Sequence, residues 1–408
     1  MDRLCPRAED GKTAAASPTL GEVLRAFLSS VACLLQLGAR PLRVLRLLAA
    51  CGTPELGANI YRCRACQKRH FAPRSCGDRH CPRCLAAKSR HWLEEQLASL
   101  LPIPYYHCVF TLPQPLHGLV LLNPSRLYPL LFDCASQALL EFGRTRLGGD
   151  LGLTAVLHTW GQALNFHPHL HCIVTGGALR ADGQSWTSPK QRKFLFPVRA
   201  LGALFRGKFL HGLKAMLESA EPLRLPDSSL KTRESRGRWF SNLYAQRWHV
   251  YAKRPFGGPE QVLTYLAHYT HRVALSNRRI VALDPARQTV TFTYRDYRHG
   301  SKVKALTLSA LEFIRRFSWH ILPAGLVRLR HYGILANNRR HRDIARARAI
   351  LQRRSHRGPP PKLAPLPVGQ PLMRCPHCGH EGLRWIGFLD AQGRTHLRPT
   401  TTLIWDSS

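Results

Sequence analysis

The stretch that decides the fold of this 408-residue chain is His167-Pro168-His169-Leu170-His171-Cys172-Ile173-Val174. Side chains alternate between the two faces of a β-strand, so His169 and His171 share one face, while Leu170 and Cys172 point into an apolar layer. Pro168 would stand at the start of the strand, where a missing N–H is tolerated. Two imidazoles side by side make two-thirds of a divalent-metal site. The alternative is a histidine-rich strand edge that binds no metal.

The charge of the chain indicates what it binds. Sixty Lys and Arg residues stand against 24 Asp and Glu residues, a formal net charge of +36. A fold does not need such an excess, whereas binding of phosphates does. No run reaches the roughly 18 apolar residues of a membrane-spanning helix, and the sequence start lacks the apolar core of a secretion signal. We therefore expect a cytoplasmic protein that binds nucleic acid and no membrane.

The cysteine spacing predicts structural zinc. Thirteen cysteines, several in Cys-x-x-Cys pairs, indicate metal ligands in a reducing compartment. Two pairs at a spacing that suits one tetrahedral Zn²⁺ are formed by Cys63, Cys66, Cys81 and Cys84. Such a closed site would position DNA and carry no chemistry. Four unligated thiols at this spacing are the alternative.

The sequence does not determine the role of two further groups of possible metal ligands. Cys76 and His80 lie between the two pairs and could complete a second site, replace a ligand or pack. Cys375 and Cys378 form a late Cys-x-x-Cys pair with only histidines close by in sequence, so a site there would lack ligands.

Hydrophobic periodicity and turn signals divide the chain into helices and strands. We expect strands at 105–112 and 153–163, and the second would carry His158, Trp160 and Gln162 on one face beside the histidine pair. Helices are expected at 125–147, 199–219 and 308–355, and a charged loop at 223–238. The expected regions are a loose tail (1–17), a helical and zinc-binding DNA-binding domain (18–100), a catalytic domain (101–305), a basic helical DNA-binding region (306–357), and a proline-rich linker with a Cys-x-x-Cys tail (358–408).

The sequence predicts a helix that starts at Pro259 and carries two tyrosines four residues apart. Tyr265 and Tyr269 share one flank of this helix, and Arg272 lies close by. They could be ordinary residues at the edge of an apolar core. Further on, ten arginines and one acid lie between residues 328 and 357. A solvated basic face is the alternative to DNA contact there, for which the candidates are Arg272, Arg328, Arg330, Arg339 and Arg340.

These elements suit one type of chemistry. A metal held by neutral imidazoles can polarise a phosphate, and a tyrosine phenolate can attack phosphorus to form a covalent phosphotyrosine. Between residues 151 and 216 the only acid is Asp182, in a predicted turn, which argues against a carboxylate-rich two-metal nuclease.

At these residues the sequence resembles the two-tyrosine HUH (histidine–hydrophobe–histidine) transposases of the insertion-sequence ninety-one type. His169-Leu170-His171 resembles the HUH motif, and the run from Tyr265 through Tyr269 to Arg278 is similar to that family's tyrosine segment. Phe110-Thr111-Leu112 resembles the first HUH-enzyme motif, and Cys63–Cys84 resembles the N-terminal zinc-binding domain. The resemblance covers residues 20–350.

The resemblance implies an α+β fold: an HUH endonuclease-like antiparallel sheet with flanking helices, preceded by a small zinc-ribbon-like module and followed by a basic helical region. It implies a bacterial, nucleoid-associated enzyme that nicks and joins single-stranded DNA in rolling-circle transposition through a 5′-phosphotyrosine, with the second tyrosine available for transfer to the target. Many such enzymes add a third metal ligand from the neighbouring strand. We expect Gln162 rather than His158, because an amide oxygen suits Mg²⁺ or Mn²⁺. A plasmid relaxase or replication initiator shares this chemistry, and a zinc-dependent regulator with an inactive centre is the alternative outside enzymes.

Overall fold

A five-stranded antiparallel sheet forms the centre of the structure, with strand order β13-β5-β6-β3-β9. The computed structural model describes residues 17–85, 100–190, 195–227, 230–253, 273–355 and 374–398. The histidine stretch lies on β6, the middle strand, as expected. The bounds of the sheet strands are β3 (Tyr105–Thr111), β5 (Gly152–Trp160), β6 (Phe166–Thr175), β9 (Val250–Lys253) and β13 (Leu329–Gly333). The α+β fold with antiparallel sheets is thereby confirmed.

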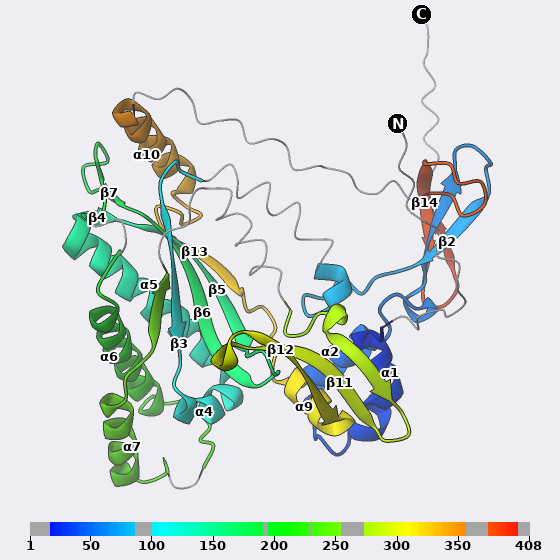
Figure 1. Ribbon diagram of the computed structural model, residues 1–408, viewed down its shortest axis with the longest axis horizontal. Coiled ribbons are helices and arrows are strands. Elements are labelled where there is room, and N and C mark those ends of the chain that lie inside the picture. Colours follow the sequence, from blue (N-terminus) through cyan, green and yellow to red (C-terminus); the bar gives the residue numbers. More distant parts are fainter. Residues whose placement is uncertain are drawn as a thin grey trace, which may run out of the picture.

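Helices cover one face of this sheet (Figure 1). Leu170, Cys172 and Val174 point into this apolar layer and are fully buried, which is the alternation expected for β6. Burial of one such aliphatic side chain stabilises the fold by about 1.5–3 kcal/mol. The covering elements are η2 (Gln114–Leu116), α4 (His117–Leu122), α5 (Pro124–Leu147), α6 (Val198–Leu217) and α7 (Arg233–Ala245).

The helices predicted at 125–147 and 199–219 are confirmed, but the loop predicted at 223–238 is wrong from residue 233 onward. There α7 begins, and its N-cap Thr232 accepts a hydrogen bond from the backbone N–H of Ser235. Trp239, Phe240 and Leu243 then pack on the apolar core. Burial of this apolar face outweighs the polar composition of the segment.

The other face of the sheet carries the histidines at one end and a second apolar cluster at the other. Tyr105 and Ile173 pack there against Ile344 and Ala347. The partners are α10 (Arg340–Ser355) and a small sheet of β4 (Gly149–Asp150), β7 (Ala178–Arg180) and β8 (Trp186–Thr187).

The prediction of a continuous helical region at 308–355 is wrong. The chain first completes β12 (Lys302–Ser309) and then forms the short helix α9 (Ala310–Ser318). It next adds β13 to the edge of the central sheet, paired with β5 from Leu329↔Val156 to Gly333↔Gly152. A strand of five residues inside an arginine-rich run gives too weak a period-2 signal to be separated from its helical neighbours.

A second body, which we call the helix–meander body, packs the start of the chain against residues 277–318. Leu24 and Phe27 are buried against Phe313 and Phe317. Thr19 and Glu22 form a reciprocal capping box at the start of α1. Its elements are α1 (Leu20–Val31), α2 (Ala39–Ala49), η4 (Asn277–Arg279), β10 (Ile280–Asp284), β11 (Thr289–Asp296), η5 (Tyr297–His299), β12 (Lys302–Ser309) and α9 (Ala310–Ser318).

The helix–meander body holds the turn that joins β5 to β6. Leu164 is fully buried in its core, with φ at 57°. Arg316 donates to the carbonyl oxygen of Ala163 over 3.1 Å, and Arg279 donates to that of Gln162. His320 lies 3.2 Å from the carbonyl oxygen of Leu164 and donates to it through Nε2. The end of the central sheet next to the histidines is therefore fixed by side chains from another body.

A small sheet with strand order β15-β14-β1-β2 makes up a third part, at the upper right of Figure 1. It joins the two ends of the described chain, since β1 pairs with β14 from Ala58↔Leu389 to Cys63↔Leu383. We call it the cysteine sheet. Its strands are β1 (Ala58–Cys63), β2 (Arg69–Pro73), β14 (Leu383–Leu389) and β15 (Thr395–Leu397), and η1 (Pro54–Leu56) precedes it.

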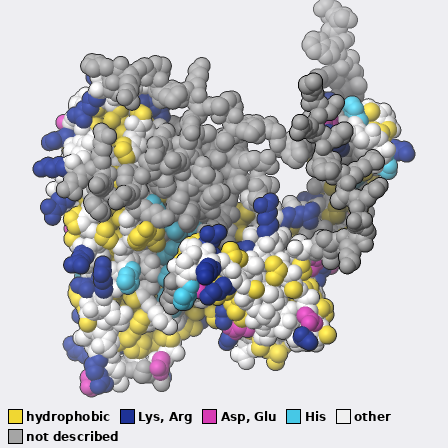
Figure 2. Space-filling view, in the orientation of Figure 1, with side chains coloured by type: hydrophobic (Ala, Val, Ile, Leu, Met, Phe, Trp, Pro, Cys, Tyr) yellow, Lys and Arg dark blue, Asp and Glu magenta, His cyan; other side chains and the backbone are white. Residues whose placement is uncertain are grey.

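The visible surface is rich in lysine and arginine and poor in acidic side chains (Figure 2). Histidine side chains show near the middle of this face. Among the described residues, none of the helices combines the length and apolarity that a membrane crossing requires.

Candidate functional site

Three buried histidines on neighbouring strands form a compact cluster on one face of the central sheet. His158, His169 and His171 each have a ring nitrogen within 4.8 Å of those of the other two. The Nε2 atoms of His169 and His171 are 3.1 Å apart. This separation of ligand nitrogens suits one metal at about 2.0–2.2 Å from each. The predicted pairing of His169 and His171 on one face therefore has the geometry of a metal site.

Hydrogen bonds from the outer ring nitrogens orient the pair. His169 Nδ1 lies 2.6 Å from the carbonyl oxygen of His167, and His171 Nδ1 lies 2.9 Å from Nε2 of His107. When these Nδ1 atoms carry the proton, the Nε2 atoms present lone pairs toward each other, as ligation requires. His107 lies on β3, diagonally across from His171. The sequence did not single out His107, because strand register decides which side chains of β3 face the pair.

The third imidazole of the cluster belongs to His158. His158 is directly opposite His169 in the β5–β6 register, and its ring stacks on Trp160 with centroids 4.5 Å apart. β5 ends at Trp160, so the expected face shared by His158, Trp160 and Gln162 does not extend that far. Gln162 lies in the following turn, where its carbonyl oxygen accepts from Arg279. The structure thus brings together three imidazoles and places Gln162 beyond the strand.

Burial lowers the pKa of three histidines near the cluster. It lowers the pKa of His167 and of His117, and it lowers the pKa of His320 to about 3. These three rings therefore add no positive charge that would repel a cation near pH 7.

The two tyrosines and Arg272 lie outside the described residues. The chain enters the segment that contains them from Lys253, which pairs with His107. It leaves at Val273, and Arg279 a few residues later donates to the carbonyl oxygen of Gln162. Both ends of the tyrosine segment are thus attached to strands or turns that border the histidine cluster.

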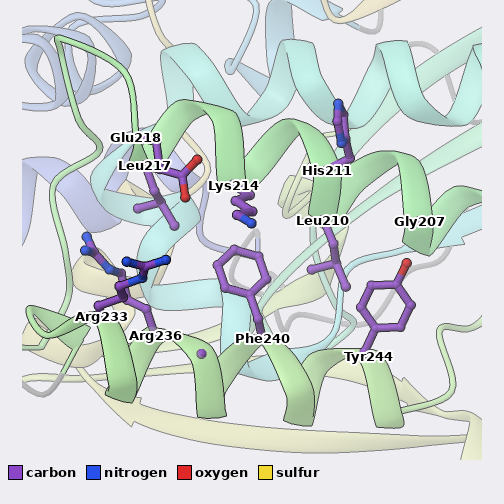
Figure 3. A pocket seen from close by; sticks show the side chains of 11 residues that line it. Gly207, Leu210, His211, Lys214, Leu217, Glu218, Arg233, Arg236, Phe240 and Tyr244 are labelled. Carbon is purple, nitrogen blue, oxygen red and sulfur yellow. The ribbon is translucent and has the colours of Figure 1, made fainter.

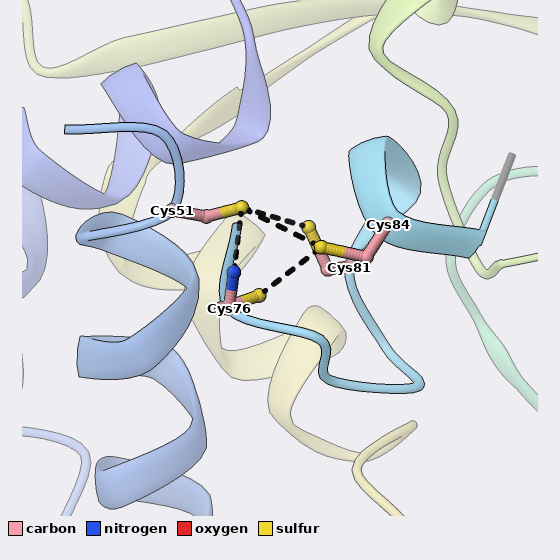
Figure 4. Close-up of side chains that lie close together, drawn as sticks. All are labelled: Cys51, Cys76, Cys81 and Cys84. Atoms are coloured by element: carbon pink, nitrogen blue, oxygen red, sulfur yellow. Dashed lines mark hydrogen bonds between the residues drawn. The ribbon is translucent and has the colours of Figure 1, made fainter. Parts of the chain in front are cut away.

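The structure does not bring Cys63, Cys66, Cys81 and Cys84 together, which corrects the predicted single zinc site. Instead, the Cys81–Cys84 pair clusters with Cys51 and Cys76 (Figure 4). The sulfur–sulfur distances are 3.5 Å for Cys51–Cys81, 3.7 Å for Cys51–Cys84 and 3.6 Å for Cys76–Cys84. A tetrahedron with zinc–sulfur bonds of 2.3 Å has edges of about 3.8 Å. These four thiols therefore fit a closed structural zinc site.

Cys51 was missed because it stands alone after α2 and forms no Cys-x-x-Cys pair. Cys63 and Cys66 lie with Cys375 and Cys378, from the opposite end of the described chain.

His80 belongs to neither cluster. Its Nδ1 is 2.7 Å from the Asp78 carboxylate, and its Nε2 accepts from the backbone N–H of Leu322 over 3.0 Å. His80 therefore fastens the cysteine loop to the chain after α9.

A separate cavity of about 540 Å³ lies between α6 and α7 (Figure 3). Lys214 of α6 points toward Phe240 of α7, and Arg233 and Arg236 lie at one end. These helices belong to the apolar face of the central sheet, opposite the face with the histidines. The cavity is therefore not part of the histidine cluster.

Three of the arginines predicted to contact DNA either contact other side chains or are buried in the described chain. Arg339 forms ion pairs with Asp343 and, at 3.0 Å, with Asp150. The guanidinium of Arg330 lies 4.3 Å from the centre of the Phe132 ring, and burial lowers the pKa of Arg328 to about 10. Arg340 begins α10. DNA contact by these residues stays a prediction.

Comparison with known proteins agrees with this geometry. Residues 152–342, which include β5, β6 and the tyrosine segment, match a family described as "Putative transposase". Residues 23–112 match a family described as "Transposase zinc-binding domain". The chain is 41% identical over 351 residues to "Putative transposase y4qJ" of Sinorhizobium fredii (strain NBRC 101917 / NGR234), covering 83% of this chain and 87% of that protein. The chain belongs to the insertion-sequence ninety-one type of transposases.

A second relative of this transposase is "Transposase for insertion sequence element IS801" of Pseudomonas savastanoi pv. phaseolicola. It is 28% identical over 339 residues, which cover 81% of this chain and 80% of that protein. The expected family is thus confirmed, including its N-terminal zinc-binding domain, and the transposase acts on DNA. The zinc-binding match ends at residue 112 and does not include Cys375 or Cys378.

Proposed function

We propose that this transposase nicks single-stranded DNA at the ends of its element and rejoins it through a 5′-phosphotyrosine on Tyr265 or Tyr269. The observation that carries the proposal is the cluster of His158, His169 and His171 on the central strands of an antiparallel sheet. The attachment of both ends of the tyrosine segment beside this cluster supports it further.

In the proposed reaction, the phenolate oxygen of one tyrosine attacks the scissile phosphorus. A P–O bond forms to the tyrosine, the bond from phosphorus to the 3′ oxygen breaks, and that oxygen leaves as a 3′-OH after it takes up a proton. A divalent metal held by the three histidines would polarise the phosphate. The second tyrosine would accept the other strand, and attack of a 3′-OH on a phosphotyrosine would rejoin DNA and release the phenol.

The donor set makes Mn²⁺ a better candidate than Mg²⁺. Mg²⁺ prefers oxygen ligands and holds its waters tightly, whereas imidazole suits first-row transition metals. The expectation of Mg²⁺ or Mn²⁺ rested on the amide oxygen of Gln162. With His158 as the third ligand, we propose that Mn²⁺ supports nicking and that Mg²⁺ supports it weakly.

The test is formation of a covalent adduct. The purified full chain is incubated with Mn²⁺ and single-stranded oligonucleotides that tile the DNA flanking its gene, and products are separated on a denaturing gel. Wild type should give a protein–DNA adduct, and the Tyr265→Phe, Tyr269→Phe double variant should give none. Removal of two hydroxyls leaves packing nearly unchanged, so its unfolding transition and DNA affinity should match those of wild type.

A Tyr244→Phe variant serves as the matched control, because Tyr244 is an exposed tyrosine on the opposite side of the sheet. It should form the adduct at the wild-type level. An adduct that persists in the double variant would refute the assignment of the nucleophiles. Tight DNA binding without an adduct from any oligonucleotide would favour a DNA-binding regulator with an inactive centre.

A further inference from the structure

The last Cys-x-x-Cys pair of the chain meets the first one. In the cysteine sheet, Cys63 Sγ is 3.6 Å from Cys378 Sγ, and Cys66 Sγ is 3.6 Å from Cys375 Sγ. The expected edge of a zinc–thiolate tetrahedron is about 3.8 Å, whereas a disulfide requires about 2.05 Å. The spacing therefore fits four ligands around one ion and does not fit two disulfides.

The backbones of the two pairs are matched turns. In the first, the N–H of Gln67 donates to the carbonyl of Cys63, and the N–H of Cys63 donates to that of Lys68, both over 3.1 Å. In the second, Gly379 donates to Cys375 over 2.8 Å, and Cys375 donates to His380 over 2.9 Å.

The residue after the second cysteine is left-handed in both turns, with φ at 57° for Gln67 and 71° for Gly379. A turn of this form directs both thiols of a pair, and the neighbouring N–H groups, toward one point. Two such turns that face each other build a complete tetrahedral site.

Strand pairing brings the two turns together independently of the thiols. β14 pairs with β1 along its whole length and makes β1 an inner strand of the sheet. The N–H of Arg64 in the first turn also donates to the carbonyl of Gly382 over 3.2 Å. Gly57 lies so close to this strand that an added Cβ would be 2.0 Å from the carbonyl oxygen of Leu389.

We propose that Cys63, Cys66, Cys375 and Cys378 hold a second structural zinc ion, which fastens the C-terminal segment 374–398 to the N-terminal module. The transposase then carries two four-thiolate zinc sites, and the zinc-binding module is completed only by the end of the chain. The ligands Cys66 and Cys375 are 309 residues apart, so this ion closes most of the polypeptide into a loop. The inference does not depend on the proposed cleavage reaction.

The experiment counts zinc per chain by mass spectrometry. It uses the full chain in a His169→Ala, His171→Ala background, so that zinc captured by the histidine cluster does not contribute. The parent should hold two zinc ions, and the Cys375→Ser, Cys378→Ser variant should hold one. Cys33→Ser is the matched control, since Cys33 is exposed and belongs to neither cluster, and it should retain two.

A second measurement covers the case in which the serine variant misfolds. A protease recognition sequence is inserted between residues 356 and 373 of the otherwise native chain, which is then cut. The C-terminal fragment should co-elute with the rest in gel filtration and separate after chelation under reducing conditions. Two zinc ions in the folded Cys375→Ser, Cys378→Ser variant would overturn the proposal, as would a fragment that separates before chelation.

Discussion

His107 offers a test of how the histidine cluster is oriented. Its Nε2 lies 2.9 Å from Nδ1 of His171, and the two rings are nearly parallel, with centroids 5.1 Å apart. Both side chains are buried, at 2% and 8% exposure. In His107→Phe, a ring of similar size remains, but the hydrogen bond between His107 Nε2 and His171 Nδ1 is lost.

The size of the expected loss in metal affinity follows from the loss of this one hydrogen bond. Loss of an outer partner of a metal-ligating histidine lowers metal affinity about 10- to 100-fold, which corresponds to about 1.4–2.7 kcal/mol. We expect the half-saturating Mn²⁺ concentration to rise about 10- to 100-fold, while nicking at saturating Mn²⁺ stays within a few-fold of wild type.

The assay needs no DNA in its first form, because free Mn²⁺ gives an electron paramagnetic resonance signal that is lost on binding. His107→Gln should restore most of the affinity, since its amide oxygen can accept the same hydrogen bond. His331→Phe is the control: His331 bonds Thr154 over 2.9 Å on the same face of the sheet, away from the cluster. Equal Mn²⁺ affinity in wild type and His107→Phe would refute the proposed orientation of His171.

Three further predictions concern the ligands and the fold. His158→Gln should reduce the preference of nicking for Mn²⁺ over Mg²⁺ by about tenfold, because an oxygen replaces an imidazole; an unchanged preference in rate assays would show that His158 is not a ligand. Cys81→Ser should lose one zinc ion and the near-ultraviolet circular dichroism of the helix–meander body, since binding of structural zinc contributes about 10–16 kcal/mol to the folding of small domains. A variant that keeps both the zinc ion and the signal would contradict the assignment of Cys81 to a zinc site with Cys51. Burial lowers the pKa of His320 to about 3, so its contribution to stability is present above pH 6.5 and is lost as the pH falls toward 3. Between pH 7 and pH 5 this loss is about 2 kcal/mol, and denaturant titrations should find it absent in His320→Gln.

Local pattern was enough to predict the elements that carry the site. Alternation placed His169 and His171 on one face of a strand, and β6 has that arrangement with Leu170 and Cys172 buried beneath. The helices α5 and α6 of the apolar face were equally predictable, because their apolar periodicity is long and regular. Elements that form only beside a partner distant in sequence could not be predicted in this way. β13 is recognisable as a strand only once β5 is there to pair with it.

The same distinction explains what the sequence left out at the metal sites. The choice of Gln162 assumed that β5 continues past Trp160, but the chain turns there, and side chains from the helix–meander body hold the turn carbonyls. The sequence near residue 160 gives no indication of these contacts with the helix–meander body. His158 was present in the predicted strand, and register alone decides that it stands opposite His169.

For the cysteines, spacing identified half-sites and not their pairing. A Cys-x-x-Cys turn supplies two of the four ligands of a tetrahedral site. The sequence contains three such pairs, and their spacing does not determine which cysteines share a site. Proximity in sequence favoured the pairs at Cys63 and Cys81. Strand pairing decides otherwise: β1 ends at Cys63 and pairs with β14, and the turn that precedes β14 carries Cys375 and Cys378. The pair at Cys81 is then left to be completed by Cys51 and Cys76, each of which stands alone in the sequence. A late Cys-x-x-Cys pair that lacks nearby ligands is therefore better interpreted as the missing half of an early one whenever a short strand adjoins each.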